Sequence, residues 1–250
     1  MKFYSEYDAW VSYPALVGGG LFYLFSVFGL KAITASSPIY KVKQFSIAYN
    51  IAQVVLCAYM TYGFFVYGFS FTNPFGFNNQ FTAEIEWFIF VHYLSKFLDF
   101  FDTYIMVLKK SWRQFTFLHV FHHASIGVIW GFLLLVGQGN GVAYFGAFIN
   151  SFVHLLMYSH YLFTSLGYEN PYKFFITYIQ MFQFGLCILQ AVLSLFIEKV
   201  FDIKLAWLQV GYHIIMLYLF NDFLTNAKKA KKSGDGQAAK TEKKQSKKME

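Results

Sequence analysis

Long apolar runs separated by short polar connections dominate the sequence. A helix needs about 20 mostly apolar residues to cross the hydrocarbon core of a membrane, and seven runs of the chain meet that need. Their apolar residues are continuous and do not alternate over about ten residues, which favours helices over a membrane barrel. The pattern therefore predicts an all-α, polytopic membrane protein with seven transmembrane helices at 11–30, 45–67, 84–108, 115–136, 142–166, 174–197 and 205–224.

Composition agrees with this class of protein. Of the 250 residues, 57% are hydrophobic and 13% are charged, whereas about 25% are charged in a typical soluble domain. We expect residues 1–225 to form one membrane domain. The lysine-rich tail at 226–250 has almost no apolar side chains and is expected to be disordered. No phosphate-binding loop stands in a strand-to-helix setting, and we expect no nucleic-acid partner.

Basic residues indicate the orientation of the chain, because cytosolic loops of membrane proteins carry the excess of Lys and Arg. The connections at 31–44, 109–114 and 167–173 share one side with the tail and hold seven basic residues, and nine more lysines follow residue 225. The opposite side holds only three. We therefore expect a lumenal N-terminus and a cytosolic C-terminus. The final "KKME" matches the dilysine signal of the endoplasmic reticulum, which predicts a location in that membrane.

Ionisable and amide side chains stand inside four of the predicted spans. A charged group there costs about 2.5–3.5 kcal/mol and therefore indicates a functional site. Steps of three or four residues place most of these groups on one face of each helix, and Lys96 can pair with Asp99. The groups are Lys96, Asp99 and Asp102 in the third span, His119, His122 and His123 in the fourth, Asn150, His154, Tyr158, His160 and Tyr161 in the fifth, and Thr177, Gln180 and Gln183 in the sixth.

These groups stand at overlapping depths. Given the orientation above, all four sets fall in the cytosolic half of the bundle. This predicts one polar chamber that opens to the cytosol and is closed towards the lumen by apolar side chains. Lys109, Lys110 and Arg113 would flank its mouth and could hold the phosphates of a bound cofactor. His213, isolated in the last span, is expected to be a hydrogen-bonding group of the core.

Two chemistries fit the H-x-x-H-H cluster at 119–123. Neutral imidazole is the commonest metal ligand, and membrane di-iron desaturases and hydroxylases use this spacing. Those enzymes need more histidine clusters than the seven histidines and single box of this chain provide. Imidazole also acts without metal as a nucleophile and general acid/base, and a water-poor pocket protects an acyl-imidazole from hydrolysis. We favour the metal-free interpretation. A seven-span receptor or transporter is a further alternative.

Four segments resemble, in order, the signatures of one family of membrane enzymes. "KFLDFFDT" (96–103), "HVFHH" (119–123), "NSFVHLLMY" (150–158) and "TYIQMFQ" (177–183) are similar to those of the ELO family of very-long-chain fatty acid elongases. The resemblance extends over residues 45–224. It implies a seven-span fold and a condensing enzyme, a very-long-chain 3-oxoacyl-CoA synthase. Such an enzyme joins malonyl-CoA to a long-chain acyl-CoA by decarboxylative condensation, giving 3-ketoacyl-CoA.

The resemblance also implies roles for individual residues. The catalytic residues would be His119, His122, His123 and His154. Of these, His122 would accept the acyl group, and His154 would assist decarboxylation or orient the bound carbonyl. The other polar residues of the four spans would line the chamber, and no metal or cofactor is implied beyond the two CoA substrates. Two positions depart from the family: Asp99 replaces the usual Glu, which shortens the reach of that carboxylate, and His160 replaces a Tyr.

Substrate and partners follow from the same resemblance. Residues 49–63 and 109–123 resemble most the polyunsaturated-chain elongases of unicellular eukaryotes, which implies a C18–C20 polyunsaturated acyl-CoA. The chain holds no dinucleotide site, so reduction of the product must fall to other enzymes. We therefore expect the chain to be embedded in membrane lipid. Its expected protein partners in the same membrane are a ketoacyl-CoA reductase, a dehydratase and an enoyl-CoA reductase. The sequence does not decide whether the chain forms a homo-oligomer.

Overall fold

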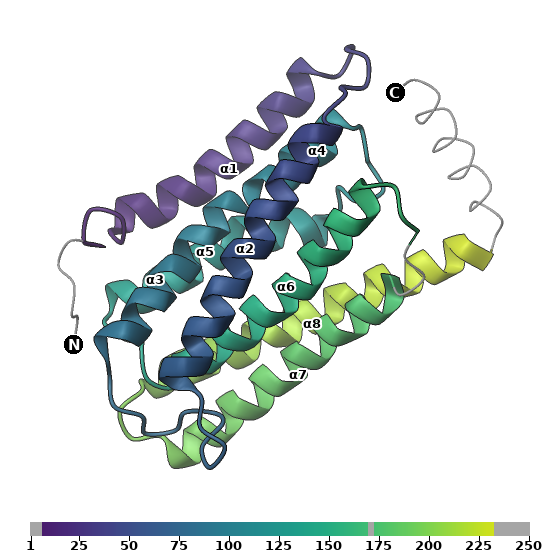
Figure 1. Ribbon diagram of the computed structural model, residues 1–250. Coiled ribbons are helices and arrows are strands. Elements are labelled where there is room, and N and C mark those ends of the chain that lie inside the picture. Colours follow the sequence, from purple (N-terminus) through teal and green to yellow (C-terminus); the bar gives the residue numbers. More distant parts are fainter. Residues whose placement is uncertain (1–6, 170–172, 233–250) are drawn as a thin grey trace.

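The computed structural model describes residues 7–169 and 173–232 of the chain, and within them it is entirely helical (Figure 1). The helices coincide with the predicted apolar runs, except that the third run is divided into two. The elements are α1 (Tyr13–Ile33), α2 (Lys43–Gly68), α3 (Ala83–Leu98), α4 (Phe100–Leu108), α5 (Phe117–Leu135), α6 (Ala143–Ser165), α7 (Lys173–Ile197) and α8 (Ile203–Lys232).

Hydroxyl side chains mark three of the helix starts. Ser12 accepts a hydrogen bond from the backbone of Ala15 at the start of α1, and Thr82 does the same for Ile85 at the start of α3. Thr116 caps α5 by accepting from the backbone amide of His119. Such caps satisfy amide groups that would otherwise lack an intrahelical partner. The cap on α5 therefore sets the register of the histidine cluster relative to the start of the helix.

The third span bends at a carboxylate. Asp99 separates α3 from α4, and its backbone amide donates to Ser95 while its carbonyl accepts from Asp102, three residues on. A tight three-residue turn inside a long helix is typical of a functional site. The Ser95 hydroxyl also donates to the carbonyl of His92, a contact that tends to bend helices. Sequence periodicity did not predict this break, because the apolar run continues through it.

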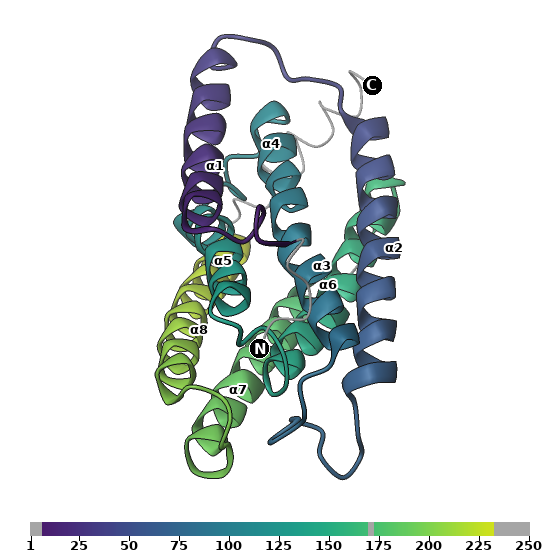
Figure 2. The same ribbon diagram turned by 90° about the vertical axis from the view of Figure 1, so that its left-hand side faces the viewer.

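Helices α3 and α4 follow one another directly and pack against four other helices. Helix α4 packs against α1, and α3 packs against α2, α5 and α6. Figure 2 shows α4 with α1 on one side and α2 on the other. The remaining contacts join α1 to α5, α5 to α8, α8 to α7, α7 to α6 and α6 to α2. Helices α3 and α4 therefore carry their polar residues among α1, α2, α5 and α6.

Helix α4 continues in the direction of α3, and the other successive helices alternate in direction, so the connections gather at two ends of the bundle (Figure 1). The connections α2–α3 and α7–α8 meet at one end, where the backbone amide of Asn78 donates to Glu198 at 2.7 Å and its side chain donates to the carbonyl of Ile197. The opposite end, where α5 begins, carries the basic connection 109–116; we call it the basic end. The predicted orientation would make this the cytosolic side.

In the part of the chain that the structure describes, five helices, α1, α2, α5, α7 and α8, are long and apolar enough to cross a membrane. Large apolar side chains cover their outer faces, and Phe25 and Phe196 are 76% and 83% exposed. Helices α3 and α4 are shorter, with 16 and 9 residues, and α6 carries the polar groups of the fifth predicted span. The chain is therefore a multi-pass membrane protein, and the count of seven spans stays a prediction.

Helix α8 continues to Lys232, seven residues beyond the predicted limit of the membrane domain. The added segment, 226–232, is rich in Ala and Lys, which favour helices, and basic residues stabilise a helix C-terminus. The Lys228 ammonium donates to the hydroxyl of Tyr178 at 2.6 Å, which ties this turn to α7. Helix α8 therefore extends into the first residues of the segment predicted to be a tail, and the division into a membrane domain and a disordered tail stays a prediction. Residues 233–250, with the dilysine signal, lie outside the described residues.

Candidate active site

The histidine cluster occupies the first two turns of α5. The rings of His119 and His123 are 4.2 Å apart between centroids, and those of His122 and His123 are 5.6 Å apart. His119 Nε2 lies 2.8 Å from the hydroxyl of Thr103 on α4, and that hydroxyl lies 2.9 Å from the phenol of Tyr23 on α1. Three helices therefore hold the cluster in place.

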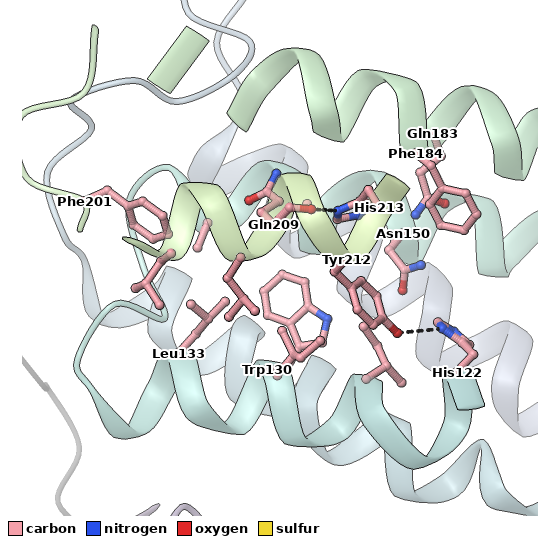
Figure 3. Close-up of a pocket in the computed structure, with 16 residues that line it drawn as sticks. His122, Trp130, Leu133, Asn150, Gln183, Phe184, Phe201, Gln209, Tyr212 and His213 are labelled. Carbon is pink, nitrogen blue, oxygen red and sulfur yellow. Dashed lines mark hydrogen bonds between the residues drawn. The ribbon is translucent and has the colours of Figure 1, made fainter. Parts of the chain in front are cut away.

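His122 points away from α4 and towards α8. Its Nδ1 atom lies 3.1 Å from the hydroxyl of Tyr212, which in turn lies 3.2 Å from the hydroxyl of Ser125 (Figure 3). Within the described residues, the side chain of His122 forms no other hydrogen bond. Its second ring nitrogen is therefore available to a ligand.

A carboxylate cluster surrounds the bend between α3 and α4. Asp99 Oδ1 accepts from the amide of Gln53 at 2.8 Å, and the hydroxyl of Tyr158 lies 2.9 Å from the same oxygen. The Tyr158 hydroxyl also lies 2.6 Å from Asp102 Oδ2. Lys96 Nζ stands 3.7 Å from Asp99 Oδ2, so the pair predicted from the spacing is confirmed. All five side chains are buried.

Helix α6 connects this cluster to the histidines. The Lys96 ammonium donates to the side-chain oxygen of Asn150 at 3.0 Å. His154, one turn further along α6, has its Nδ1 atom 4.0 Å from Asp99 Oδ2. The polar faces of the third and fifth predicted spans are therefore in direct contact, as their depths along the chain predicted.

A pocket extends from His122 between α5, α6, α7 and α8 (Figure 3). Its cavity volume is about 60 Å³, so an acyl chain would have to move some of the lining side chains apart. His122, Asn150 and Gln183 lie at one end, and Leu133 and Phe201 lie at the other, with Trp130 between them. A polar head and a long apolar body suit an amphipathic ligand. The lining residues are His122, Ile126, Ile129, Trp130, Leu133, Ala143, Gly146, Asn150, Gln183, Phe184, Phe201, Leu205, Leu208, Gln209, Tyr212 and His213.

The polar residues of α7 lie beside this pocket. Gln183 is buried and lines it. Gln180 donates to the sulfur of Met157 on α6 at 3.5 Å, and Thr177 is buried one turn nearer the basic end. Side-chain contacts thus run from α4 to α5, from α3 and α4 to α6, and from α6 to α7, and the joining of all four predicted stripes in one chamber stays a prediction. Whether the chamber opens to the cytosol stays a prediction.

Other predicted site residues lie further from the pocket. Tyr161 has its ring 6.0 Å from that of Tyr158, and His160 has its ring 5.8 Å from that of Tyr161. The basic residues Lys109, Lys110 and Arg113 follow α4 at the basic end and do not line the pocket. The Lys110 ammonium donates to the carbonyl of residue 35, which ties this connection to the one after α1.

Several polar partners of the site were missed from the sequence. Tyr49 and Gln53, one turn apart on α2, both reach the carboxylate cluster, and Gln53 Nε2 donates to the Tyr49 hydroxyl at 2.8 Å. Their spacing of four in an apolar run was a signal that could have found them. Tyr212 left no such signal, because the chain has 19 tyrosines and most stand in apolar runs. His213, expected to be a core group, lines the pocket while its Nδ1 atom contacts the carbonyl of Gln209.

Comparison with known proteins identifies the family of this chain. The profile of the GNS1/SUR4 family, also called ELO, matches residues 10–235. Fatty acid elongase 5 of Leishmania major is 48% identical over 224 residues, which are 88% of this chain and 88% of that protein. Fatty acid elongase 5 of Trypanosoma cruzi is 45% identical over 232 residues, 93% of this chain and 90% of that protein. Very long chain fatty acid elongase 5 of Homo sapiens is 32% identical over 225 residues, which are 84% of this chain and 72% of that protein.

The match includes every helix from α1 to α8. The chain therefore belongs to the ELO (GNS1/SUR4) family.

Proposed function

We propose that this protein is the condensing enzyme of fatty acid elongation. It would join malonyl-CoA to a long-chain acyl-CoA by decarboxylative condensation and release 3-ketoacyl-CoA, CoA and CO2. Family membership supports the elongase class, and the relatives named above are fatty acid elongases. The acyl-histidine route and the identity of the acyl chain go beyond those comparisons, and their support comes from the site.

One observation carries the proposal: His122 stands where the polar groups end and the apolar pocket begins (Figure 3). An acyl chain lying in the apolar part would bring its carbonyl carbon to the ring of His122. Imidazole is a nucleophile that splits one difficult acyl transfer into two easier steps. The surrounding side chains exclude water, which protects an acylated intermediate from hydrolysis.

The proposed reaction has two halves. First, a ring nitrogen of His122 attacks the thioester carbonyl; the new C–N bond replaces the C–S bond, and CoA leaves as a thiolate that takes a proton from water. Second, malonyl-CoA loses CO2, and the electron pair of the broken C–C bond forms a new C–C bond to the acyl carbon. The pair of the C–N bond then returns to His122.

The polar groups on α3 and α6 suit the second half. Charge develops on oxygen when malonyl-CoA decarboxylates, and fixed donors in a water-poor site stabilise such charge strongly. Lys96 and Asn150 form a donor pair beside the pocket, and His154 is held near Asp99. We assign decarboxylation and carbonyl orientation to this group. His119 and His123 would support His122 from the preceding and following turns of the cluster.

The depth of the pocket indicates a long chain. Residues 122 and 133 are about 16 Å apart along α5 at the helical rise per residue. An extended single-bonded chain advances about 1.2 Å per bond, as the extended backbone does, so a chain lying along this stretch would span about 13 bonds. Longer chains would continue towards Phe201 and Leu205. The preference for C18–C20 polyunsaturated chains rests on the resemblance of residues 49–63 and 109–123 and is part of this proposal.

The cellular setting belongs to the proposal as well. We place the protein in the endoplasmic reticulum with its basic end in the cytosol, where acyl-CoA and malonyl-CoA are soluble. There Lys109, Lys110 and Arg113 would contact the CoA phosphates, because basic side chains form strong charge-assisted bonds with phosphate. The reductases and dehydratase of the elongation cycle would receive the product in the same membrane.

The decisive experiment supplies microsomes containing the full chain with labelled malonyl-CoA and a panel of acyl-CoA substrates. Label is expected in acyl products lengthened by two carbons, and its absence across the panel would contradict the proposal. With acyl-CoA alone, the wild-type protein is expected to release CoA and His122→Asn to release none. Asn keeps a donor towards Tyr212 but has no nucleophile. Phe117→Ala is the matched control, because Phe117 is on the same helix and is 72% exposed.

A further inference from the structure

The hydroxyl groups beside His122 form a chain whose direction can be worked out. Ser125 Oγ lies 2.7 Å from the backbone carbonyl of Phe121, one turn earlier on α5. A carbonyl oxygen only accepts, and a serine hydroxyl has a single proton. The Ser125 proton is therefore committed to the backbone. In its 3.2 Å contact with Tyr212, Ser125 can only accept.

The same count applies to the next member of the chain. Tyr212 also has one hydroxyl proton, and the contact with Ser125 is a hydrogen bond only if Tyr212 donates it there. Its oxygen is then left to accept from His122 Nδ1, 3.1 Å away. If Tyr212 donated to His122 instead, two lone pairs would face each other between Tyr212 and Ser125. A buried polar contact without a proton is costly.

We propose that Tyr212 is a positioning residue for acyl transfer that holds the proton of His122 on Nδ1 and leaves the lone pair of Nε2 free. This inference rests on the proposed role of His122 as acyl acceptor. The tautomer of a histidine is set by the hydrogen bond that its other nitrogen makes, and a wrong tautomer removes most of its catalytic power. The chain of donors runs from His122 to Tyr212, then to Ser125, and ends on the backbone of α5.

The arrangement keeps proton balance simple. When Nε2 attacks the thioester, the C–S bond breaks, the thiolate takes a proton from water, and Nδ1 keeps its proton, so an acyl-imidazolium forms. Tyr212 accepts from this charged ring more strongly than from the neutral one. When the carbon nucleophile from malonyl-CoA takes the acyl group, the C–N electron pair returns to Nε2. Neutral imidazole is restored in its starting tautomer without any proton crossing the pocket.

The test measures steady-state condensation by the full-length protein in microsomes, with acyl-CoA varied and malonyl-CoA saturating. Tyr212→Phe removes one hydrogen bond to a group that becomes charged, so kcat is expected to fall about 10- to 100-fold while KM stays within about twofold. Ser125→Ala is expected to lower kcat at least as much, because the Tyr212 proton would turn towards Nδ1. Ser125→Thr keeps the hydroxyl and should restore activity. Tyr218→Phe is the matched control, since Tyr218 is on the same helix and is 73% exposed.

A double-mutant cycle separates positioning from packing. In the Tyr212→Phe background, Ser125→Ala is expected to have no further effect, because Ser125 acts only through Tyr212. Equal losses in both backgrounds would overturn the inference, and so would a kcat of Tyr212→Phe equal to that of the wild type. If His122→Asn still released CoA, the proposed function itself would fail. If His122→Asn releases no CoA and Tyr212→Phe has the kcat of the wild type, the proposed function stands and only the inference about Tyr212 fails.

Discussion

The hydroxyl of Tyr158 on α6 lies 2.6 Å from Asp102 Oδ2 on α4, and its other close carboxylate neighbour is Asp99, 2.9 Å away. One phenol proton cannot serve both carboxyl groups. Both contacts are hydrogen bonds only if one carboxyl group is itself protonated. Asp99 already faces Lys96 and accepts from Gln53, so we expect the proton on Asp102.

Isosteric substitutions distinguish the two carboxyl groups. Asp102→Asn places an amide donor where the acid proton would be, and activity is expected to stay within about threefold of the wild type. Asp99→Asn removes the charge that faces Lys96 and should lower activity more than tenfold, because a buried ammonium is left without its partner. The test compares the elongation rates of both variants with that of the wild type, and their unfolding midpoints check that they fold. The reverse order of sensitivity would refute the assignment.

Removal of Lys96 should destabilise the bundle. Its ammonium is 2% exposed and lies between Asn150 and Asp99, and loss of one partner of a buried pair costs about 3–5 kcal/mol. We expect Lys96→Met to lower the unfolding midpoint in detergent micelles. The double variant Lys96→Met with Asp99→Asn should recover part of that loss. If both variants unfold at the same temperature, the two groups are not coupled.

Narrowing the pocket should shorten the accepted chain. Gly146 lines the pocket, and a Cβ atom there would stand 3.5 Å from the ring of Trp130. Gly146→Leu is therefore expected to place its branch in the acyl space and to reject long acyl-CoA while sparing shorter ones. Gly185→Leu is the control, because a Cβ atom at that helical position meets nothing within 4 Å. Product lengths across an acyl-CoA panel measure the effect, and an unchanged profile would mean that the acyl chain binds elsewhere.

Close packing of α2 against α3 depends on Gly63. A Cβ atom there would overlap the ring of Phe88, and overpacking of this kind costs about 1–3 kcal/mol. Gly63→Ala should therefore lower stability. Gly29→Ala, where a Cβ atom meets nothing within 4 Å, should raise it slightly, because Ala favours helices over Gly by about 1 kcal/mol. Denaturation of both variants under the same conditions tests the difference, and a stabilised Gly63→Ala would show that the two helices can separate freely.

Activity should not depend on a metal. In residues 7–169 and 173–232, no three His, Cys, Asp or Glu side chains stand together in a way that could hold one ion. A metal-free mechanism predicts that EDTA and iron chelators leave condensation unchanged and that purified protein carries no stoichiometric iron. Loss of activity that iron restores would favour the di-iron alternative.

Local pattern was enough to locate the helices and the polar faces. A helix start or end follows from apolar content and caps within a few residues, so the ranges predicted for α2, α5 and α6 agree closely with the structure. The three-residue and four-residue steps from Lys96 to Asp102 and from Asn150 to Tyr158 share a face in any helix. These properties depend on neighbours in sequence, and the sequence by itself determined them.

Tertiary structure alone decided which side chains pair across the polar faces and which further groups complete the site. The bend at Asp99 leaves no mark on hydropathy, because the run remains apolar on both sides. Tyr212 stands 90 residues from His122, and their contact depends on how α8 packs against α5. Hydrogen-bond partners across a bundle are set by interhelical packing and loop geometry, which are sums of many weak contacts. The amino-acid sequence therefore could not show that Tyr212 on α8 contacts His122 on α5.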